Sequence, residues 1–255
     1  MSMMPEYIVV TGREAKRFKE LSTAVPAVDE IVFLDHDEIV QRYWPLLPSA
    51  FPDYQFCLVE HTTGRAVARG HSLPVVYDDP WSSLPDEGFD WVLEKGFLDR
   101  AEGRIPTVLS ALYIVISDTF RGRNLSARML DAMRQIGRDK GLTHLIVPLR
   151  PSVKALYPLI DIDEYCRWLD SNGEPFDSWL RVHVRTGGKV IQTCRRAMTV
   201  SGSRQQWSEW TGVDFPRDGN YVVPHALVPL TVRGNLGSYV EPGIWVVHDL
   251  QEECS

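Results

Sequence analysis

The sequence lacks the features that mark a secreted, membrane-spanning or disulfide-rich protein. It holds four cysteines, which stand singly and form neither CxxC pairs nor a dense pattern: Cys57, Cys166, Cys194 and Cys254. We therefore expect reduced thiols in a cytoplasmic protein. No apolar run approaches the roughly 20 residues that a transmembrane helix needs. The N-terminal stretch MSMMPEYIVVTGREAKRF also lacks the layout of a signal peptide.

Positive charge is scarce as well. The 27 lysines and arginines are outnumbered by 34 acidic residues, for a net charge of −7. This balance argues against a nucleic-acid-binding or membrane-binding protein, and an anionic ligand would need a local cluster of positive charge. The seven histidines show no HExxH spacing, so we predict no metal site. Neither a GxxxxGK[ST] loop nor a GxSxG elbow is present.

The middle of the chain carries the clearest periodic patterns. TVLSALYIVIS (107–117) is a nearly continuous apolar run, which predicts a strand buried on both faces. Leu125, Met129, Met133 and Ile136 recur at helical spacing and predict a helix over 124–140, which Gly141 would end. THLIVPLR (143–150) predicts a second buried strand, and SVKALYPL (152–159) a short helical turn. A crossover of this length implies parallel strands in an α/β arrangement.

The remaining segments are less regular, and none repeats. YIVV (7–10) predicts a first strand, 36–47 a helix cut by prolines, 55–76 a hairpin around Thr62-Thr63-Gly64, and 89–103 a short helix. Residues 177–194 predict a second hairpin around Thr186-Gly187-Gly188, with His183 on the polar face of its first arm. Residues 226–250 predict strands broken by prolines. With no linker in view, we expect a single domain over 1–255, with an insertion near 77–106 and an extended β-rich part at 163–255.

The stretch SDTFRGRNLSARML (117–130) joins the first buried strand to the helix. A helix N-terminus has unpaired N–H groups and partial positive charge, so it stabilises a phosphate. Gly122 allows close backbone approach, and Arg121, Arg123 and Arg128 add local charge. The pattern is typical of a pyrophosphate site, although a solvated basic turn has the same composition.

This stretch resembles the acetyl-CoA motif of the GNAT superfamily of N-acetyltransferases, which reads Arg or Gln, two residues, Gly, one residue, then Gly or Ala. The matching positions are Arg121, Asn124 and Ser126, so two usual small positions are replaced. Family members often carry Asn after the next strand and Tyr seven residues later. Arg150 and Tyr157 stand at those positions. The resemblance is good over 107–162.

The resemblance implies a mixed, mostly antiparallel central sheet with a parallel strand-helix-strand core and helices on both faces. It implies acetyl-CoA or another acyl-CoA as co-substrate, with no metal, and transfer of the acyl group to a small-molecule amine. Backbone groups near Val115 and Ile116 would hold the pantetheine arm, and Tyr157 would be the general acid. The pyrophosphate would lie on the turn and helix start formed by Arg121, Gly122, Arg123, Asn124, Leu125 and Ser126.

Several alternatives stay open at this point. The donor could be a longer acyl-CoA or an acyl-carrier protein, and the chain could be a catalytically silent acyl-CoA sensor or an interaction module. The general base is not identified, and its candidates are Asp118, Glu60, His71, His183 and Glu241. DHDE (35–38) could touch a metal but is more typical of a helix start. QQWSEW (205–210) could line an acceptor pocket, a core or a dimer contact, and a homodimer remains one option.

Overall fold

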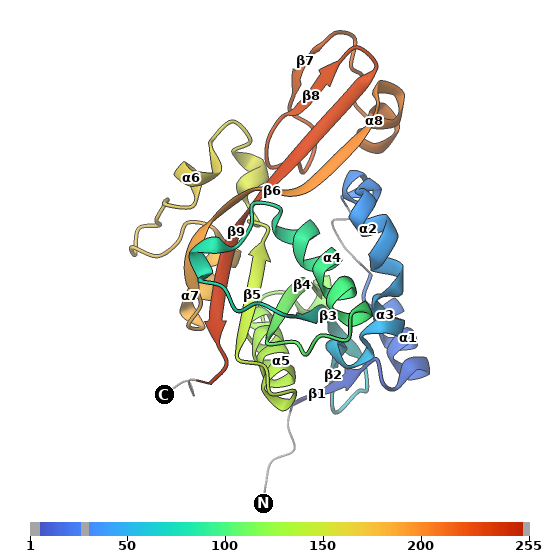
Figure 1. The fold of residues 1–255 in the computed structure, drawn as a ribbon, viewed down its shortest axis with the longest axis vertical. Helices are drawn as coiled ribbons and strands as arrows, with labels where there is room; N and C mark the ends of the chain where they lie inside the picture. Colours follow the sequence, from blue (N-terminus) through green and yellow to red (C-terminus); the bar gives the residue numbers. More distant parts are fainter. Residues whose placement is uncertain (1–5, 27–30, 252–255) are drawn as a thin grey trace, which may run out of the picture.

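The fold is built on one open, twisted sheet. The computed structural model describes residues 6–26 and 31–251, and its strands follow the order β1-β2-β3-β4-β5-β9-β8-β7, with β6 paired to β9 (Figure 1). The strands are β1 (Tyr7–Thr11), β2 (Gln55–Glu60), β3 (Ala66–Val75), β4 (Val108–Ile116), β5 (His144–Leu149), β6 (Lys189–Ser203), β7 (Gly219–Tyr221), β8 (Leu230–Arg233) and β9 (Leu236–Asp249). Every pairing is antiparallel except β4 with β5. The expected mixed, mostly antiparallel sheet is confirmed.

Helices lie on both faces of this sheet. They are α1 (Ala15–Thr23), α2 (Glu38–Tyr43), α3 (Leu47–Ala50), α4 (Gly88–Ala101), α5 (Leu125–Asp139), α6 (Ile162–Tyr165), α7 (Ser178–Arg185) and α8 (Arg204–Thr211). One core cluster joins α5, α6 and α7 to one face, and a second joins α2, α3 and α4 to the other. Within the described ranges, no helix combines the length and apolar composition needed to cross a membrane.

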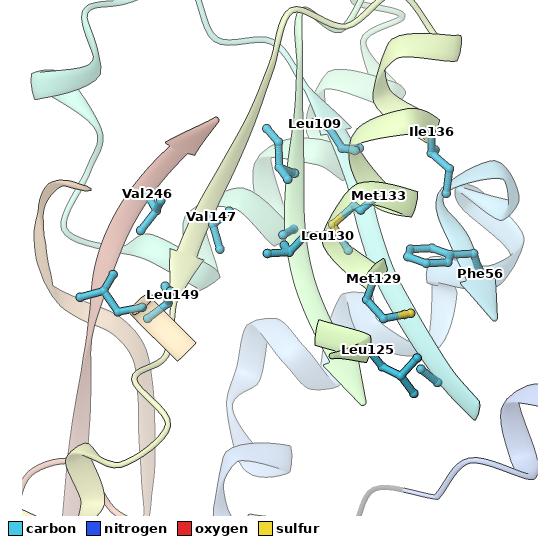
Figure 2. Packing of buried hydrophobic residues seen from close by; sticks show 14 of the residues in the cluster. Phe56, Leu109, Leu125, Met129, Leu130, Met133, Ile136, Val147, Leu149 and Val246 are labelled. Carbon is cyan, nitrogen blue, oxygen red and sulfur yellow. The ribbon is translucent and has the colours of Figure 1, made fainter. Parts of the chain in front are cut away.

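Helix α5 anchors the first of these cores. Met129, Leu130 and Met133 are fully buried, because their spacing keeps them on the stripe that faces the sheet. Figure 2 shows them packed over β4 and β5, beside Leu109 and Val147. The helix predicted over 124–140 and the two flanking strands are therefore confirmed.

Strands β4 and β5 separate soon after they begin. Their parallel register contains only Leu109 opposite Leu145 and Ser110 opposite Ile146. The far edge of β4 stays paired with β3 to Ile116, and β5 stays paired with β9 throughout. Two strand edges therefore face each other without pairing among the described residues.

The C-terminal third extends the same sheet and forms a projecting arm. The arm consists of β7, β8, α8 and the adjoining halves of β6 and β9, and it stands at the top of Figure 1. Its own small core surrounds Trp207, Tyr239 and Phe33, so Trp207 of QQWSEW is a core residue. Pro242 does not break β9 as expected, because β6 is out of register between Cys194 and Met198 at that point, where a missing N–H is tolerated.

One predicted hairpin is wrong. Residues 178–185 form helix α7, and a strand begins only at Lys189. Asp177 caps this helix by accepting hydrogen bonds from the backbone N–H groups of Trp179 and Leu180, as a helix-start aspartate does. The alternating valines imitated a strand, but Leu180 and His183, three residues apart, both face the core. His183 is thus buried and not on a polar face.

Replacing Met129 tests the packing of α5. Met129→Ala should lower the free energy of unfolding by about 2–5 kcal/mol, because it empties a fully buried site. Urea denaturation measures this change. Arg138→Ala, on the exposed face of the same helix, should stay within about 0.5 kcal/mol of the wild type. Equal losses in the two variants would contradict the assigned packing.

Candidate functional site

The space between the separated strands is where the backbone can receive a ligand. Val115 and Ile116 lie on the last part of β4, opposite Arg69 and Ala68 of β3, which leaves the β5-facing edge of β4 unpaired. The Val115 side chain is buried, so only its backbone is offered on that edge. Unpaired strand edges readily take up an extended ligand that carries amide groups.

The turn after β4 leads directly to an open helix start. Gly122 has φ +80° and Asn124 has φ +56°, so both adopt the left-handed conformation that glycine and asparagine tolerate. Asn124 precedes α5 without a side-chain cap, and the first turn of α5 carries no acidic residue. Leu125 is buried and Ser126 is half-buried. The first N–H groups of α5 therefore remain available for an anion.

Three arginines surround this helix start, and each already makes a contact. Arg121 forms an ion pair with Asp118 at 2.8 Å. The Arg123 guanidinium lies 4.9 Å from the centre of the Phe120 ring, and Arg128 pairs with Glu6 at 3.1 Å. All three side chains are largely exposed, so these contacts are weak and can be exchanged for a phosphate.

Tyr157 lies in an aromatic cluster after β5. Its ring contacts Trp168 at 5.0 Å, Phe176 at 5.7 Å and Tyr165 at 6.2 Å. Its carbonyl accepts a hydrogen bond of 2.9 Å from Lys154 Nζ, which also donates to the Leu227 carbonyl at 2.7 Å. Lys154 is fully buried, and burial lowers the pKa of its ammonium group. Lys154 thus fixes the backbone of Tyr157, whose side chain is half-buried.

An ion pair between partly exposed Arg150 and buried Glu241 connects the end of β5 to the arm. Arg150 donates to both carboxylate oxygens of Glu241, at 2.8 and 3.1 Å, and to the His225 carbonyl at 2.6 Å. The Tyr239 hydroxyl donates to Glu241 at 2.6 Å and accepts from the Leu227 N–H at 2.9 Å. Glu241 raises the pKa of Arg150, although burial opposes this. Arg150, which replaces the usual family Asn, is therefore a structural clamp.

Two carboxyl groups meet on the α2–α4 face. Asp37 is buried and accepts hydrogen bonds from Ile39, Val40 and Thr199 N–H groups, so DHDE is the helix start expected. Asp90 lies beside it, and its Oδ1 is buried without a hydrogen-bond partner. Burial, and then the charge of Asp37, raise the pKa of Asp90 to about 9. One proton is therefore held by this pair near neutral pH.

Most candidate bases are already occupied. Glu241 is held by Arg150 and Tyr239, and Asp118 pairs with Arg121. Glu60 accepts a hydrogen bond from Thr63. His183 Nδ1 lies 2.9 Å from Nε2 of buried His248, and burial lowers the pKa of His183. These four groups are not poised as free bases.

His71, His183 and His248 each have one buried ring nitrogen without a hydrogen-bond partner, and His71 borders the partly exposed ring of Tyr113. The His71 side chain is 5% exposed. Nδ1 lies 2.9 Å from Gln55 Oε1, whereas Nε2 makes no hydrogen bond. The described cysteines, Cys57, Cys166 and Cys194, are free thiols, and Cys254 lies outside the described residues. The described part of the chain contains no group of three or more His, Cys, Asp or Glu placed to hold a metal ion.

Sequence reasoning missed Lys154 and the pair formed by Asp37 and Asp90. Lys154 was visible only as part of a short helical turn. Asp37 and Asp90 are separated by more than 50 residues and share no motif. A lysine inside the apolar stretch KALYPL was a signal that could have indicated burial.

The Asp90 carboxyl predicts a pH-dependent stability. In the unfolded chain its pKa is near 3.8, and in the folded protein it is about 9. Between these values the folded state binds the extra proton, so this group lowers stability as pH rises from 4 towards 9. The Asn side chain of Asp90→Asn cannot ionise. The melting temperature of this variant, relative to that of the wild type, should therefore be higher at pH 8 than at pH 4. The same difference in melting temperature between variant and wild type at both pH values would refute the raised pKa of Asp90.

The sequence is similar to that of a known enzyme. The chain is 31% identical over 246 residues to the arginine N-acetyltransferase avaD of Aspergillus versicolor, covering 86% of this chain and 84% of that protein. No family model matches the sequence.

Solved structures share the fold. The loading GNATL domain of CurA from Lyngbya majuscula superposes with a TM-score of 0.60 at 14% identity, covering 98% of this chain and all of that one. The GNAT-like decarboxylase GphF, solved with isobutyryl-CoA, gives 0.50 at 11% identity, covering 97% and 100%. The chain therefore belongs to the GNAT superfamily, and it is an N-acetyltransferase that moves an acyl group to an amine.

Proposed function

We propose that this protein transfers the acetyl group of acetyl-CoA to the amine of a small cationic acceptor, with arginine as the first candidate. The observation that carries the proposal is the separation of β4 from β5 beside the uncapped start of α5. The unpaired edge of β4 near Val115 and Ile116 suits the amide groups of pantetheine. The N–H groups of Asn124, Leu125 and Ser126, with Arg121 and Arg123 beside them, suit the pyrophosphate.

The acceptor is inferred from the relative and from the charge of the neighbouring face. The relative from Aspergillus versicolor is an arginine N-acetyltransferase. Asp37 and Asp90 lie on the α2–α4 face, close enough to Glu241 for its charge to add to the raised pKa of Asp90. A bound guanidinium or ammonium group would favour the ionised form of Asp90. This side of the sheet therefore suits a cation.

In the proposed reaction the neutral amine attacks the thioester carbonyl, and the carbon–sulfur bond breaks. The amine nitrogen loses a proton to solvent, and the departing thiolate gains one from the Tyr157 hydroxyl. The products are the N-acetylated acceptor and CoA, and Tyr157 is reprotonated from solvent. The Lys154 contact holds the Tyr157 backbone in place, which supports a fixed acid.

Ligand binding and turnover test the proposal together. Acetyl-CoA at a hundred times its Kd should stabilise the protein by about 2.7 kcal/mol in thermal unfolding. Thiol release from acetyl-CoA should then appear with arginine and weaken with neutral amines of similar size. Stabilisation without thiol release across an amine panel would favour the silent sensor instead. A lack of stabilisation would refute the donor site.

Tyr157→Phe tests the general acid. The variant should lower kcat by 10²- to 10⁴-fold, the range of a general acid or base, and leave the Kd for acetyl-CoA nearly unchanged. Steady-state thiol release and a binding titration measure the two quantities. Tyr54→Phe, at a half-buried tyrosine that packs against both core clusters and precedes β2, is the matched control. An unchanged kcat in Tyr157→Phe would remove this residue from the mechanism.

A further inference from the structure

The orphaned nitrogen of His71 lies beside a distortion of strands β3 and β4. Their register pairs His71 with Tyr113 and Ser72 with Ala111, so Leu112 of β4 has no residue opposite. Such a bulge re-aims side chains and is common next to active sites. Leu112 and Tyr113 lie two and three residues after Ser110, the last position at which β4 pairs with β5. His71 is therefore one strand away from the space that separates β4 and β5.

Gln55 fixes the protonation of His71. The Gln55 amide nitrogen donates to two backbone carbonyls, of Phe51 at 3.0 Å and Ser72 at 2.8 Å. Both amide hydrogens are thus used, and Oε1 must be the atom that faces His71 Nδ1. Nδ1 therefore carries the hydrogen, and Nε2 presents a bare lone pair. Burial and the charge of Arg69 lower the pKa of His71 to about 3, so the ring stays neutral.

Two aromatic rings lie beside the His71 ring. The His71 ring centre lies 5.2 Å from that of Trp44 and 6.3 Å from that of Tyr113, and the latter two are 6.0 Å apart. We call Trp44, His71 and Tyr113 the aromatic corner. Tyr113 is 39% exposed, so the corner reaches the surface. On its other side Trp44 contacts Phe89 at 6.3 Å, the residue before Asp90.

A buried acceptor without a partner is costly unless a ligand or water fills it. Here the missing partner must be a donor, and the surrounding ring faces favour a nitrogen that carries positive charge before it reacts. A carboxylate or a phosphate would meet the lone pair with repulsion. The chemistry of the corner therefore selects an amine.

We propose that His71 is a further substrate-binding residue, whose Nε2 accepts a hydrogen bond from the reacting amine of the acceptor within the aromatic corner. The inference rests on the proposed function and deepens it, because it names the group that orients the nucleophile. One amine N–H is directed to Nε2, and the nitrogen lone pair is left free to meet the thioester between β4 and β5. Asp37 and Asp90 would face the other end of a dibasic acceptor.

Two matched substitutions separate this role from a structural one. His71→Asn keeps a side-chain amide that can reach Gln55 but has no atom at the Nε2 position. His71→Gln places an acceptor near that position. His71→Asn should raise KM for arginine about tenfold, the effect of one lost hydrogen bond, and leave KM for acetyl-CoA within twofold. His71→Gln should recover part of the loss.

His144→Asn serves as the control, because His144 is the first residue of β5 and its ring contacts Trp81, which is not part of the aromatic corner. If His71→Asn does not fold, His71→Phe takes its place, because it keeps a flat aromatic ring but has no hydrogen-bond acceptor. Equal changes in both KM values, or no change in either, would overturn the inference. If arginine is not accepted, the amine that gives the fastest thiol release takes its place. A wild type that acetylates no amine would instead refute the proposed function.

Discussion

The structure depends on one constraint, which is that two buried parallel strands stop pairing after two residues. Strand β4 continues along β3, and β5 continues along β9, while their facing edges diverge. Backbone N–H and C=O groups at a buried edge require partners. An edge that the fold leaves unpaired is therefore a natural place for a ligand that carries its own amides. Helix α5 packs on one face of the sheet, and its N-terminus lies shortly after the end of β4.

The divergence is held open from both sides. On the β4 side, the long ladder with β3, which is interrupted by one bulge at Leu112, and the packing of α5 fix the strand. On the β5 side, Arg150 binds Glu241 and the His225 carbonyl, and Lys154 binds the Tyr157 and Leu227 carbonyls. Both charged groups are held by hydrogen bonds to a carboxylate or to backbone carbonyls, which offset the cost of removing charge from water. The arm is thus fastened to the segment that carries Tyr157, so its position and that of the tyrosine are coupled.

The two faces of the sheet differ in chemistry. Exposed arginine side chains lie around the start of α5, and they can exchange their weak ion pairs for contacts with a phosphate. The α2–α4 face carries a carboxyl pair with a raised pKa and an aromatic corner with a bare imidazole nitrogen. An anionic donor and a cationic acceptor would therefore approach from regions of opposite charge, with the diverging strands between them.

The sequence by itself determined the central strand-helix-strand unit and its basic turn. Their signals are local: a continuous apolar run, a helical stripe and left-handed positions at Gly122 and Asn124, each set by neighbours in the chain. The sequence failed at 178–185, where alternating valines imitated a strand and only burial of Leu180 and His183 decided for a helix. From the sequence, His71 was only one of several candidate bases.

Tertiary structure alone decided which polar residues meet. Asp37 with Asp90, Arg150 with Glu241 and His71 with Gln55 join elements far apart in the chain, and no periodicity encodes such pairs. Their pKa shifts and unpartnered atoms arise from burial, which depends on how the sheet, helices and arm pack around them. The local sequence thus determined the turn and helix start where an anion could bind. The packing determined which polar side chains lie together elsewhere in the fold.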